Sequence, residues 1–199
     1  MRHTINKIFV MRVFIAVLLL IFSLQSYTKA DDIRDFQIEN ISLGDSLLDY
    51  MSKEEIISNE QKVYDSNSKF YEIQYPLPGN LYEYLLFHVK RNDPNYIIHL
   101  IRGVNIVEDK KDCLKIKMKI VKEMKTLFNE DKLREGSQNH YYYKNSKQYI
   151  SQFDFENSGF IKAECVIMHE KDLKIHGSIY STLEVSISSG EFSKWLSAL

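Results

Sequence analysis

Hydrophobic and polar residues alternate with a period of two in several short stretches, which is typical of β-strands with one buried face. The stretches that we expect to be strands are residues 69–75, 81–91, 96–107, 147–155, 160–169 and 183–187. Proline, asparagine or glycine residues at 76–80, 92–95 and 156–159 supply turns between consecutive strands. Short turns between neighbouring strands predict a mainly antiparallel sheet.

A helical period replaces this alternation after Asp109, which is a suitable N-cap. The apolar residues that recur at the spacing of one helix face, and that predict a buried stripe, are Cys113, Ile116, Ile120, Met124 and Leu127. Lysines occupy other positions, and we expect them to form a solvated face, with contact to anionic lipid as the alternative. They are Lys110, Lys111, Lys115, Lys117, Lys119, Lys122 and Lys125.

Two short helical turns are expected near the beginning of the domain. Ser52-Lys53-Glu54-Glu55 has the form of a capping box. Asp45 can accept the free amides of a turn that begins at Ser46, and Gly44 supplies the tight entry. The residues predicted to face the core are Leu47, Leu48, Met51, Ile56 and Ile57.

The remaining segments complete the expected order of elements. We expect residues 35–41 to be extended and residues 189–196 to form a short C-terminal helix. Residues 129–145 are predicted to be a polar loop in which Tyr141, Tyr142 and Tyr143 pack over the core. Stacking of these tyrosines on sugars or on another protein is the alternative.

The chain is therefore predicted to be α+β: a mainly antiparallel sheet packed on one long helix, with an N-terminal short helical pair and a short C-terminal helix. No linker, internal repeat or low-complexity tract divides residues 31–199. That length suits a single domain with a hydrophobic core of its own.

Residues 1–30 have the order of a secretory signal peptide. Their charges are all positive, an apolar run extends from Val13 to Leu24, and polar residues lead to Ala30. The apolar run is shorter than the roughly 20 residues that span a bilayer, so we expect cleavage after Ala30 and no stable membrane insertion afterwards. A retained anchor is the alternative, and translation from Met11 in place of Met1 would leave a more compact signal peptide. The expected location is periplasmic or secreted.

The charge of the chain argues against nucleic acid as a partner. The formal net charge is −1, and residues 1–30 contain four cations and no acidic residue, so their removal lowers the charge to about −5. A mildly acidic domain lacks the basic surface that general nucleic-acid binding requires.

The two cysteines of the chain lie at inward positions of two predicted elements. Cys113 belongs to the apolar stripe of the helix, and Cys165 shares the phase of Ile161, Ala163 and Ile167 in its strand. In an exported protein we expect one disulfide between Cys113 and Cys165, with two separate buried thiols as the alternative. A CxxC redox site is excluded by their spacing.

The tetrapeptide Gly44-Asp45-Ser46-Leu47 resembles the motif in which the GDSL esterase family places its nucleophilic serine. The resemblance implies a secreted hydrolase with Ser46 as the nucleophile. That family also uses a late Asp-x-x-His and a central Gly-x-Asn-Asp. Here Asp172 and His176 are one residue too far apart, and Gly103-Val104-Asn105-Ile106 lacks the aspartate. We therefore expect a helix cap and no catalytic residues, with the hydrolase as the alternative.

The histidines of residues 31–199 do not match a metal-binding motif. His169-Glu170 followed by His176 is similar to a zinc-peptidase motif, but the second histidine lies seven residues after the first instead of four. His88 and His99 could face each other across a hairpin, but two histidines do not make a site. We expect neither a metal nor another cofactor.

Longer segments resemble a group of small secreted proteins from AT-rich marine bacteria that has no assigned activity. They are ISLGDSLLDYMSKEEI, HVKRNDPNYIIHLIRGVNIVEDKKDC and LEVSISSGEFSKWL. The first segment is also similar, at the level of fold, to small envelope proteins of the outer-membrane assembly machinery, which usually carry a lipid on a cysteine that this chain lacks near Ala30. These resemblances imply export and a bacterial source. Together with the missing catalytic residues, they predict an exported non-catalytic binding domain, with another envelope protein as the expected partner.

Overall fold

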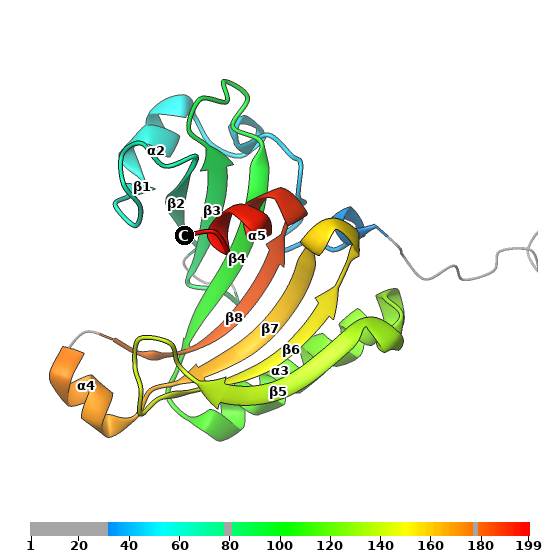
Figure 1. Cartoon of the computed structure of the whole chain (residues 1–199), viewed down its shortest axis with the longest axis vertical. Coiled ribbons are helices and arrows are strands. Elements are labelled where there is room, and N and C mark those ends of the chain that lie inside the picture. Colours follow the sequence, from blue (N-terminus) through cyan, green and yellow to red (C-terminus); the bar gives the residue numbers. More distant parts are fainter. Residues whose placement is uncertain (1–31, 78–80, 177–178) are drawn as a thin grey trace, which may run out of the picture.

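The computed structural model describes residues 32–77, 81–176 and 179–199, and the predicted signal peptide at residues 1–30 lies outside them. Within the described residues, eight strands form one antiparallel sheet (Figure 1). The sheet is accompanied by several helices. The predicted α+β class and the mainly antiparallel sheet are therefore confirmed.

The order of the strands in space differs from their order in the chain. The strands are β1 (Glu60–Gln61), β2 (Phe70–Pro76), β3 (Tyr84–Lys90), β4 (Ile98–Val107), β5 (Leu133–Asn139), β6 (Lys147–Asp154), β7 (Phe160–Ile167) and β8 (Ser181–Ser188). Across the sheet they lie in the order β1-β2-β3-β4-β8-β7-β6-β5. The central pair β4 and β8 thus joins an N-terminal half of the sheet to a C-terminal half.

Helices lie in the segments before, between and after the strands. The α-helices are α2 (Lys53–Ser58), α3 (Lys110–Leu127), α4 (Glu170–His176) and α5 (Gly190–Leu196). The 3-10 helices are η1 (Ile33–Asp35), η2 (Leu47–Asp49), η3 (Glu130–Lys132) and η4 (Glu156–Ser158). After β4, α3 carries the chain to the outermost strand β5, and β6, β7 and β8 then lead back to β4.

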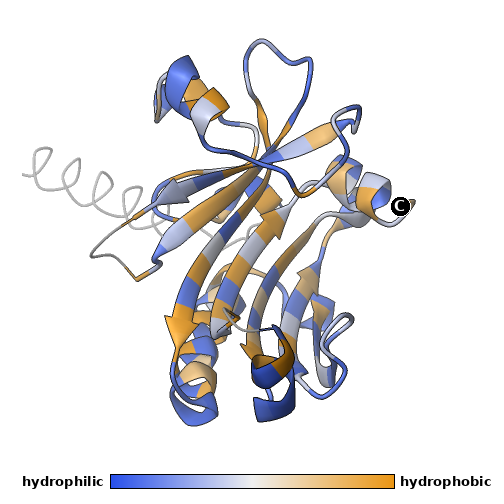
Figure 2. Cartoon of the chain, turned by 90° about the vertical axis from the view of Figure 1, so that its left-hand side faces the viewer, coloured by the Kyte–Doolittle hydropathy of each residue, from blue (hydrophilic) through white to orange (hydrophobic). Residues whose placement is uncertain are grey.

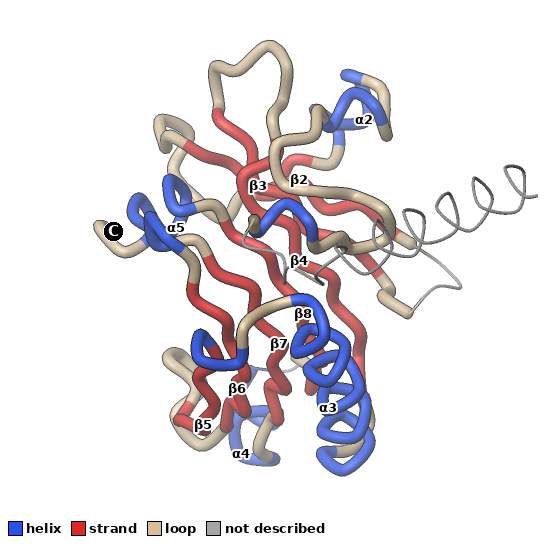
Figure 3. Tube along the Cα trace, turned by 90° about the vertical axis from the view of Figure 1, so that its right-hand side faces the viewer, coloured by secondary structure: helices blue, strands red, loops and turns tan. Residues whose placement is uncertain are grey.

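The two faces of the sheet differ because successive side chains of a strand point to opposite sides. Figure 2 shows this alternation as bands of hydrophobic and hydrophilic colour along the strands. One face carries the main core, in which Phe87, Ile101, Ile161 and Val185 have no exposed surface. Helix α3 packs on this face over β7 and β8 (Figure 3), and the segment from Ile38 to Ile56 packs on its N-terminal half. We call the opposite face the open face.

Helix α3 is capped as predicted, because Asp109 accepts hydrogen bonds from the amides of Lys111 and Asp112. The predicted buried stripe holds at Cys113 and Met124 but is wrong at Leu127, which is 39% exposed. Phe128, the next residue, is fully buried in its place.

Lys117 corrects the prediction of a fully solvated lysine face, since it is 8% exposed. It lies one turn after Cys113 and therefore on the buried face of the helix, although its side chain is charged. Its long aliphatic stem allows burial. Burial also lowers the pKa of its amino group.

The N-terminal segment differs from the expected helical pair. The first expected helix is the single 3-10 turn η2, and its N-cap is Ser46 and not Asp45. Helix α2 has the predicted capping box between Ser52 and Glu55. Leu48 and Ile57, which were expected to face the core, are 43% and 58% exposed. Each follows a residue that takes the inward position, Leu47 and Ile56 respectively, and both of these are fully buried.

The prediction that residues 129–145 form a loop is also wrong, because Leu133–Asn139 is strand β5. The sequence LREGSQN has no alternation of apolar and polar residues, and six of its seven positions are exposed. Each residue nevertheless pairs with β6, from Leu133 opposite Phe153 to Asn139 opposite Lys147. Pairing with a neighbouring strand, and not side-chain burial, makes this segment a strand.

Two further segments have a secondary structure that differs from the prediction. Residues 35–41 are not extended throughout: Ile38 and Ile41 form a bridge around a tight turn in which Glu39 and Asn40 have φ angles of 53° and 63°. Helix α4 was not predicted, because its short sequence EKDLKIH lacks a clear apolar face.

The predicted disulfide between Cys113 on α3 and Cys165 on β7 is confirmed, with Cα atoms 6.0 Å apart. Both cysteines are fully buried and pack with Leu183 of β8. The bond therefore attaches α3 to the C-terminal half of the sheet.

We expect replacement of both Cys113 and Cys165 by alanine to lower the free energy of unfolding by about 4 kcal/mol. The bond closes a loop with a sequence separation of 52 residues, and the unfolded chain gains the corresponding entropy when the bond is absent. Urea unfolding of the double variant and of the oxidised wild type measures the difference. An unchanged midpoint would contradict a stabilising role.

Candidate functional site

A row of polar side chains crosses the open face of the sheet. The strand registers place Arg102 opposite Ser186, Ser186 opposite Lys162, Lys162 opposite Gln152, and Gln152 opposite Arg134. We call these five residues the polar row. They come from five adjacent strands, β4, β8, β7, β6 and β5, so each lies about 4.8 Å from the next strand along the row.

Each cation of the polar row contacts a carboxylate on the same face. Arg102 Nη1 lies 3.4 Å from Glu184 Oε2, and Lys162 pairs with Glu164. Arg134 binds Asp154 through two nitrogens, with a distance of 2.7 Å between Nη2 and Oδ1. The row is therefore rich in hydrogen-bonding groups but carries little uncompensated charge.

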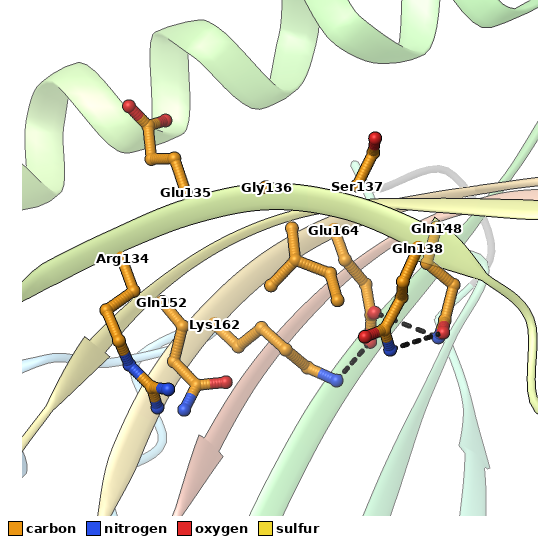
Figure 4. Close-up of a pocket in the computed structure, with 10 residues that line it drawn as sticks. Arg134, Glu135, Gly136, Ser137, Gln138, Gln148, Gln152, Lys162 and Glu164 are labelled. Carbon is orange, nitrogen blue, oxygen red and sulfur yellow. Dashed lines mark hydrogen bonds and ion pairs between the residues drawn. The ribbon is translucent and has the colours of Figure 1, made fainter.

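A groove lies over the β5 side of this row (Figure 4). One part of it has a volume of about 410 Å³ and is lined by Arg134, Gln152 and Lys162, together with Gln138, Gln148 and Glu164. A second part of about 640 Å³ shares Arg134 and Gln152 and extends to Phe160 and α5. We call these two neighbouring parts together the polar groove.

Hydrogen bonds fix the side chains of the groove relative to one another. Gln138 Nε2 donates to Gln148 Oε1 at 3.1 Å, and Gln148 Nε2 donates to Glu164 Oε2 at 3.2 Å. Gln152 Nε2 donates to Asp154 Oδ1 at 2.8 Å. Figure 4 shows that Arg134, Gln138 and Gln152 point to one side of β5, whereas Glu135 and Ser137 point toward α3.

The floor of the row also holds polar atoms with unused hydrogen-bonding capacity. Within the described residues, the buried atoms Arg102 Nε and Ser186 Oγ have no hydrogen-bond partner. Ser186 is fully buried between Arg102 and Lys162 in the row. Unsatisfied buried polar groups are uncommon in folded proteins. Neither of these two residues lines the pockets over the β5 side of the row.

An apolar cluster under α5 borders the polar row. Phe70 of β2, Leu100 of β4 and Phe192 of α5 form this cluster, and Trp195 packs against it. The ring of His88 packs against Phe192 in a tilted arrangement, with centroids 4.5 Å apart. The open face is therefore apolar beneath α5 and polar beyond it.

His88 belongs to this cluster and is neutral at physiological pH. Burial lowers its pKa to about 3, and the positive charge of Arg102 adds to the effect. Its Nε2 atom lies 3.1 Å from Tyr64 Oη and 3.3 Å from Glu72 Oε2. Because the imidazole is uncharged, the contact with Glu72 is not an ion pair, and the hydrogen bond of Nε2 is the one with Tyr64. Burial in turn raises the pKa of Glu72.

The opposite end of the open face is bordered by the loop between β5 and β6. Tyr141 and Tyr142 in this loop are each 75% exposed, so the prediction that the tyrosine run packs over the core is wrong for both. His140 of the same loop lies within the electrostatic influence of Glu164 and Glu184, which partly offsets the lowering of its pKa by burial. The loop therefore lies close to the carboxylates of the open face.

The residues of the candidate esterase motif have structural roles. Ser46 Oγ donates to the carbonyl oxygen of Asn95 at 2.6 Å and accepts from the amide of Leu48, as an N-cap does. Asp45 accepts hydrogen bonds from the amide of Ser42 and from Tyr50 Oη. Gly44 has a φ of 88°, which explains the glycine.

The structure does not bring the other parts of that motif to Ser46. Ser46 pairs with Ile97 just before the first residue of β4, whereas α4, which contains Asp172 and His176, lies near the last residues of β4 (Figures 1 and 3). Asp172 accepts hydrogen bonds from Asn145 and Ser146. Gly103 lies under the ring of Tyr82, where a Cβ atom would approach to 2.7 Å, so close packing explains it.

The histidines considered as metal ligands have different hydrogen-bonding partners. His88 is opposite Leu100 and contacts Tyr64, while His99 Nδ1 lies 3.2 Å from Ser189 Oγ. His169 Nδ1 accepts from the amide of Lys171 at 3.1 Å. In the part of the chain that the structure describes, no three histidine, cysteine or acidic side chains are placed to hold a metal ion.

Comparisons with known proteins found no matching family model, no similar curated protein and no similar solved structure. Among the described residues, no helix is both long and apolar enough to cross a membrane.

The polar row was missed in the sequence because its members are distant from one another in the chain. They extend from Arg102 to Ser186 and meet through the register of four strand pairs. The signal that could have indicated them was present in β7, where Lys162 and Glu164 occupy alternate positions between Ile161, Ala163 and Cys165. Charged residues at every second position of a buried strand indicate a polar second face.

We expect replacement of Ser46 by alanine to lower the free energy of unfolding by about 1 kcal/mol, because a helix cap and a hydrogen bond to Asn95 are lost. Any ester hydrolysis by the wild type should be unchanged. Urea unfolding and a panel of nitrophenyl esters measure the two quantities. The control is Ser66→Ala, at an exposed serine in the loop before β2. Loss of hydrolysis in Ser46→Ala with the fold retained would contradict the cap as the sole role of Ser46.

We expect the imidazole of His88 to stay neutral well below pH 6.5 in the folded protein, because burial lowers its pKa to about 3. Between these two values the unfolded chain binds a proton that the folded chain does not, so this residue makes the fold less stable as the pH falls through that range. Nuclear magnetic resonance of the imidazole carbons measures the titration, with the urea-unfolded chain as the control. A midpoint near 6.5 in the folded protein would show that the site is not desolvated.

Proposed function

We propose that this protein is an exported, non-catalytic binding domain, and that its polar groove holds an uncharged, hydroxyl-rich ligand such as a saccharide. Export rests on the signal-like order of residues 1–30, and the disulfide is compatible with it. Ser46 acts as a cap, so the geometry does not favour the hydrolase alternative.

The observation that carries the proposal is the pairing of charges in the polar row. Arg102, Lys162 and Arg134 each contact a carboxylate on the same face. An anionic or cationic ligand would have to break one of these pairs and leave a charge without its partner. This is costly for Glu164 and Glu184, which are largely buried, and less so for the exposed pair of Arg134 and Asp154. An uncharged ligand can bind while all three pairs persist.

The hydrogen-bonding groups of the groove suit hydroxyl groups in particular. Carboxylates and amide oxygens accept hydrogen bonds, whereas guanidinium, ammonium and amide nitrogens donate them. In the groove these groups alternate over short distances, as in the chain from Gln138 through Gln148 to Glu164. A hydroxyl group both donates and accepts, so neighbouring hydroxyls of one ligand can satisfy both kinds of group.

Aromatic side chains near the groove support the same ligand class. Phe160 lines the part of the groove next to α5, and Tyr142 in the loop at the other end of the open face is 75% exposed. The flat faces of such rings stack against the apolar C–H surface of sugar rings. A groove with polar groups on its floor and aromatic rings nearby is typical of a site for a polar ligand with some apolar surface.

We expect replacement of Gln152 by alanine to weaken saccharide binding about fivefold to tenfold, because it removes a hydrogen-bonding group at the centre of the groove. Gln74→Ala is the matched control. Gln74 lies on the open face of β2, opposite Leu86, which in turn lies opposite Arg102. The strands β3, β4, β8 and β7 separate β2 from β6, the strand that contains Gln152. Isothermal titration with neutral saccharides, acidic saccharides and dipeptides measures the affinities.

Binding of neutral saccharides that Gln152→Ala weakens and Gln74→Ala does not would support the proposal. Preference for acidic saccharides would contradict the argument from paired charges. Binding of dipeptides alone would instead indicate a site for an extended protein segment. If no ligand class binds, the proposed function is wrong.

A further inference from the structure

The outer edge of β5 is an unpaired sheet edge of seven residues. In the described part of the chain, β5 pairs with β6 on one side and no strand pairs with its other side. The edge at the other end of the sheet is β1, which has two residues. A long unpaired edge is a template for another strand, and proteins commonly shorten or block such edges.

The hydrogen bonds of the neighbouring residues show which backbone groups of β5 point outward. The amide of His140 donates to the carbonyl of Ser146 at 2.9 Å, and this pair continues the register of β5 and β6. Hydrogen-bonded pairs alternate along an antiparallel ladder, so Gln138, Gly136 and Arg134 direct their backbone groups toward β6. The backbone N–H and C=O groups of Glu135 and Ser137 therefore point away from the sheet.

The features that usually protect an edge are absent or turned inward in β5. The strand contains no proline. Its two charged side chains bind within the sheet: Arg134 pairs with Asp154, and Glu135 accepts a hydrogen bond from Ser151 Oγ at 2.6 Å. The charge of Arg134 is therefore compensated, and the carboxylate of Glu135, although still charged, is held against Ser151 and not along the open strand edge.

We propose that two copies of this chain associate through their β5 edges as antiparallel neighbours, with a twofold axis at Gly136. The two eight-stranded sheets would then form one continuous sheet. This association does not depend on the ligand of the polar groove.

The sequence of β5 is complementary to itself in this register. All seven residues overlap, and Glu135 of one copy, whose backbone groups point outward, lies opposite Ser137 of the partner subunit. Arg134 lies opposite Gln138 of the partner subunit. A register centred one residue earlier would place two copies of Glu135 opposite each other, and one centred on Arg134 would oppose two arginines. A Cβ built on Gly136 meets no atom within 4 Å, so the space beside Gly136 is open.

The second copy would also complete the polar groove. Arg134 and Gln138 of β5 line the groove at its outer side. On the continuous open face, Gln138 of the partner subunit would lie beside Arg134 and extend the groove across the axis. Each groove would then have walls from both copies.

The mass of the mature protein in solution tests the proposal. The full chain is expressed and the purified product is measured by light scattering after size-exclusion chromatography over a range of concentrations. We expect a wild-type mass of two chains. Ser137→Pro should give one chain, because proline removes an outward N–H that β6 does not use, so the fold is retained. Ser137→Ala is the matched control and should remain a dimer, since it keeps that N–H group.

A pair of charge variants at the same position tests the register. Ser137→Glu would place a carboxylate opposite Glu135 of the partner subunit and should weaken the dimer, whereas Ser137→Lys would place a cation there and should strengthen it. Circular dichroism verifies that each variant is folded. A wild-type mass of one chain at all concentrations overturns the proposal, as does a dimer that Ser137→Pro and Ser137→Glu leave intact. Equal effects of Ser137→Glu and Ser137→Lys overturn the register.

Discussion

The alternation of side chains along antiparallel strands is the constraint on which the rest of this structure depends. In β4 and β8, Ile101 and Val185 face α3 and the main core, and both are fully buried. The residues next to them, Arg102 and Ser186, must then lie on the open face. A slip of one residue in any strand pair would exchange the two sets, so the packing of the core also fixes the composition of the polar row.

Like charges lie close together beside the polar row, and ion pairs offset their repulsion. Glu164 is 2% exposed and lies directly opposite Glu184, an arrangement of like charges that is unfavourable by itself. Lys162 contacts the first carboxylate and Arg102 the second, so each negative charge has a partner. Loss of either cation would leave a carboxylate without its partner beside a like charge. These side chains therefore act as one unit that holds the floor of the groove in a fixed arrangement.

The sequence predicted the elements whose signal is local. The α3 helix, the β6 and β7 hairpin and the disulfide follow from periodicity, turn residues and the phase of Cys113 and Cys165. Strand β5 has no such signal, because LREGSQN is a strand through its pairing with β6. The polar row could not be predicted for a related reason: its register depends on the strand order β4-β8-β7-β6-β5, and this order requires α3 to cross to the far edge of the sheet.

That crossing also determines why the groove and the sheet edge coincide. Since α3 leads the chain from β4 to β5, the strand with the weakest alternation of apolar and polar residues becomes the outermost one. The strands with clearer alternation, β6, β7 and β8, lie between it and β4. Arg134 and Gln138 of this edge strand contribute side chains to the groove, while Glu135 and Ser137 contribute backbone groups to the edge. A ligand that orders side chains of β5 and a second copy that orders its backbone would act on the same strand, through alternate residues. If association and ligand binding are coupled through β5, each changes the affinity of the other by the same factor.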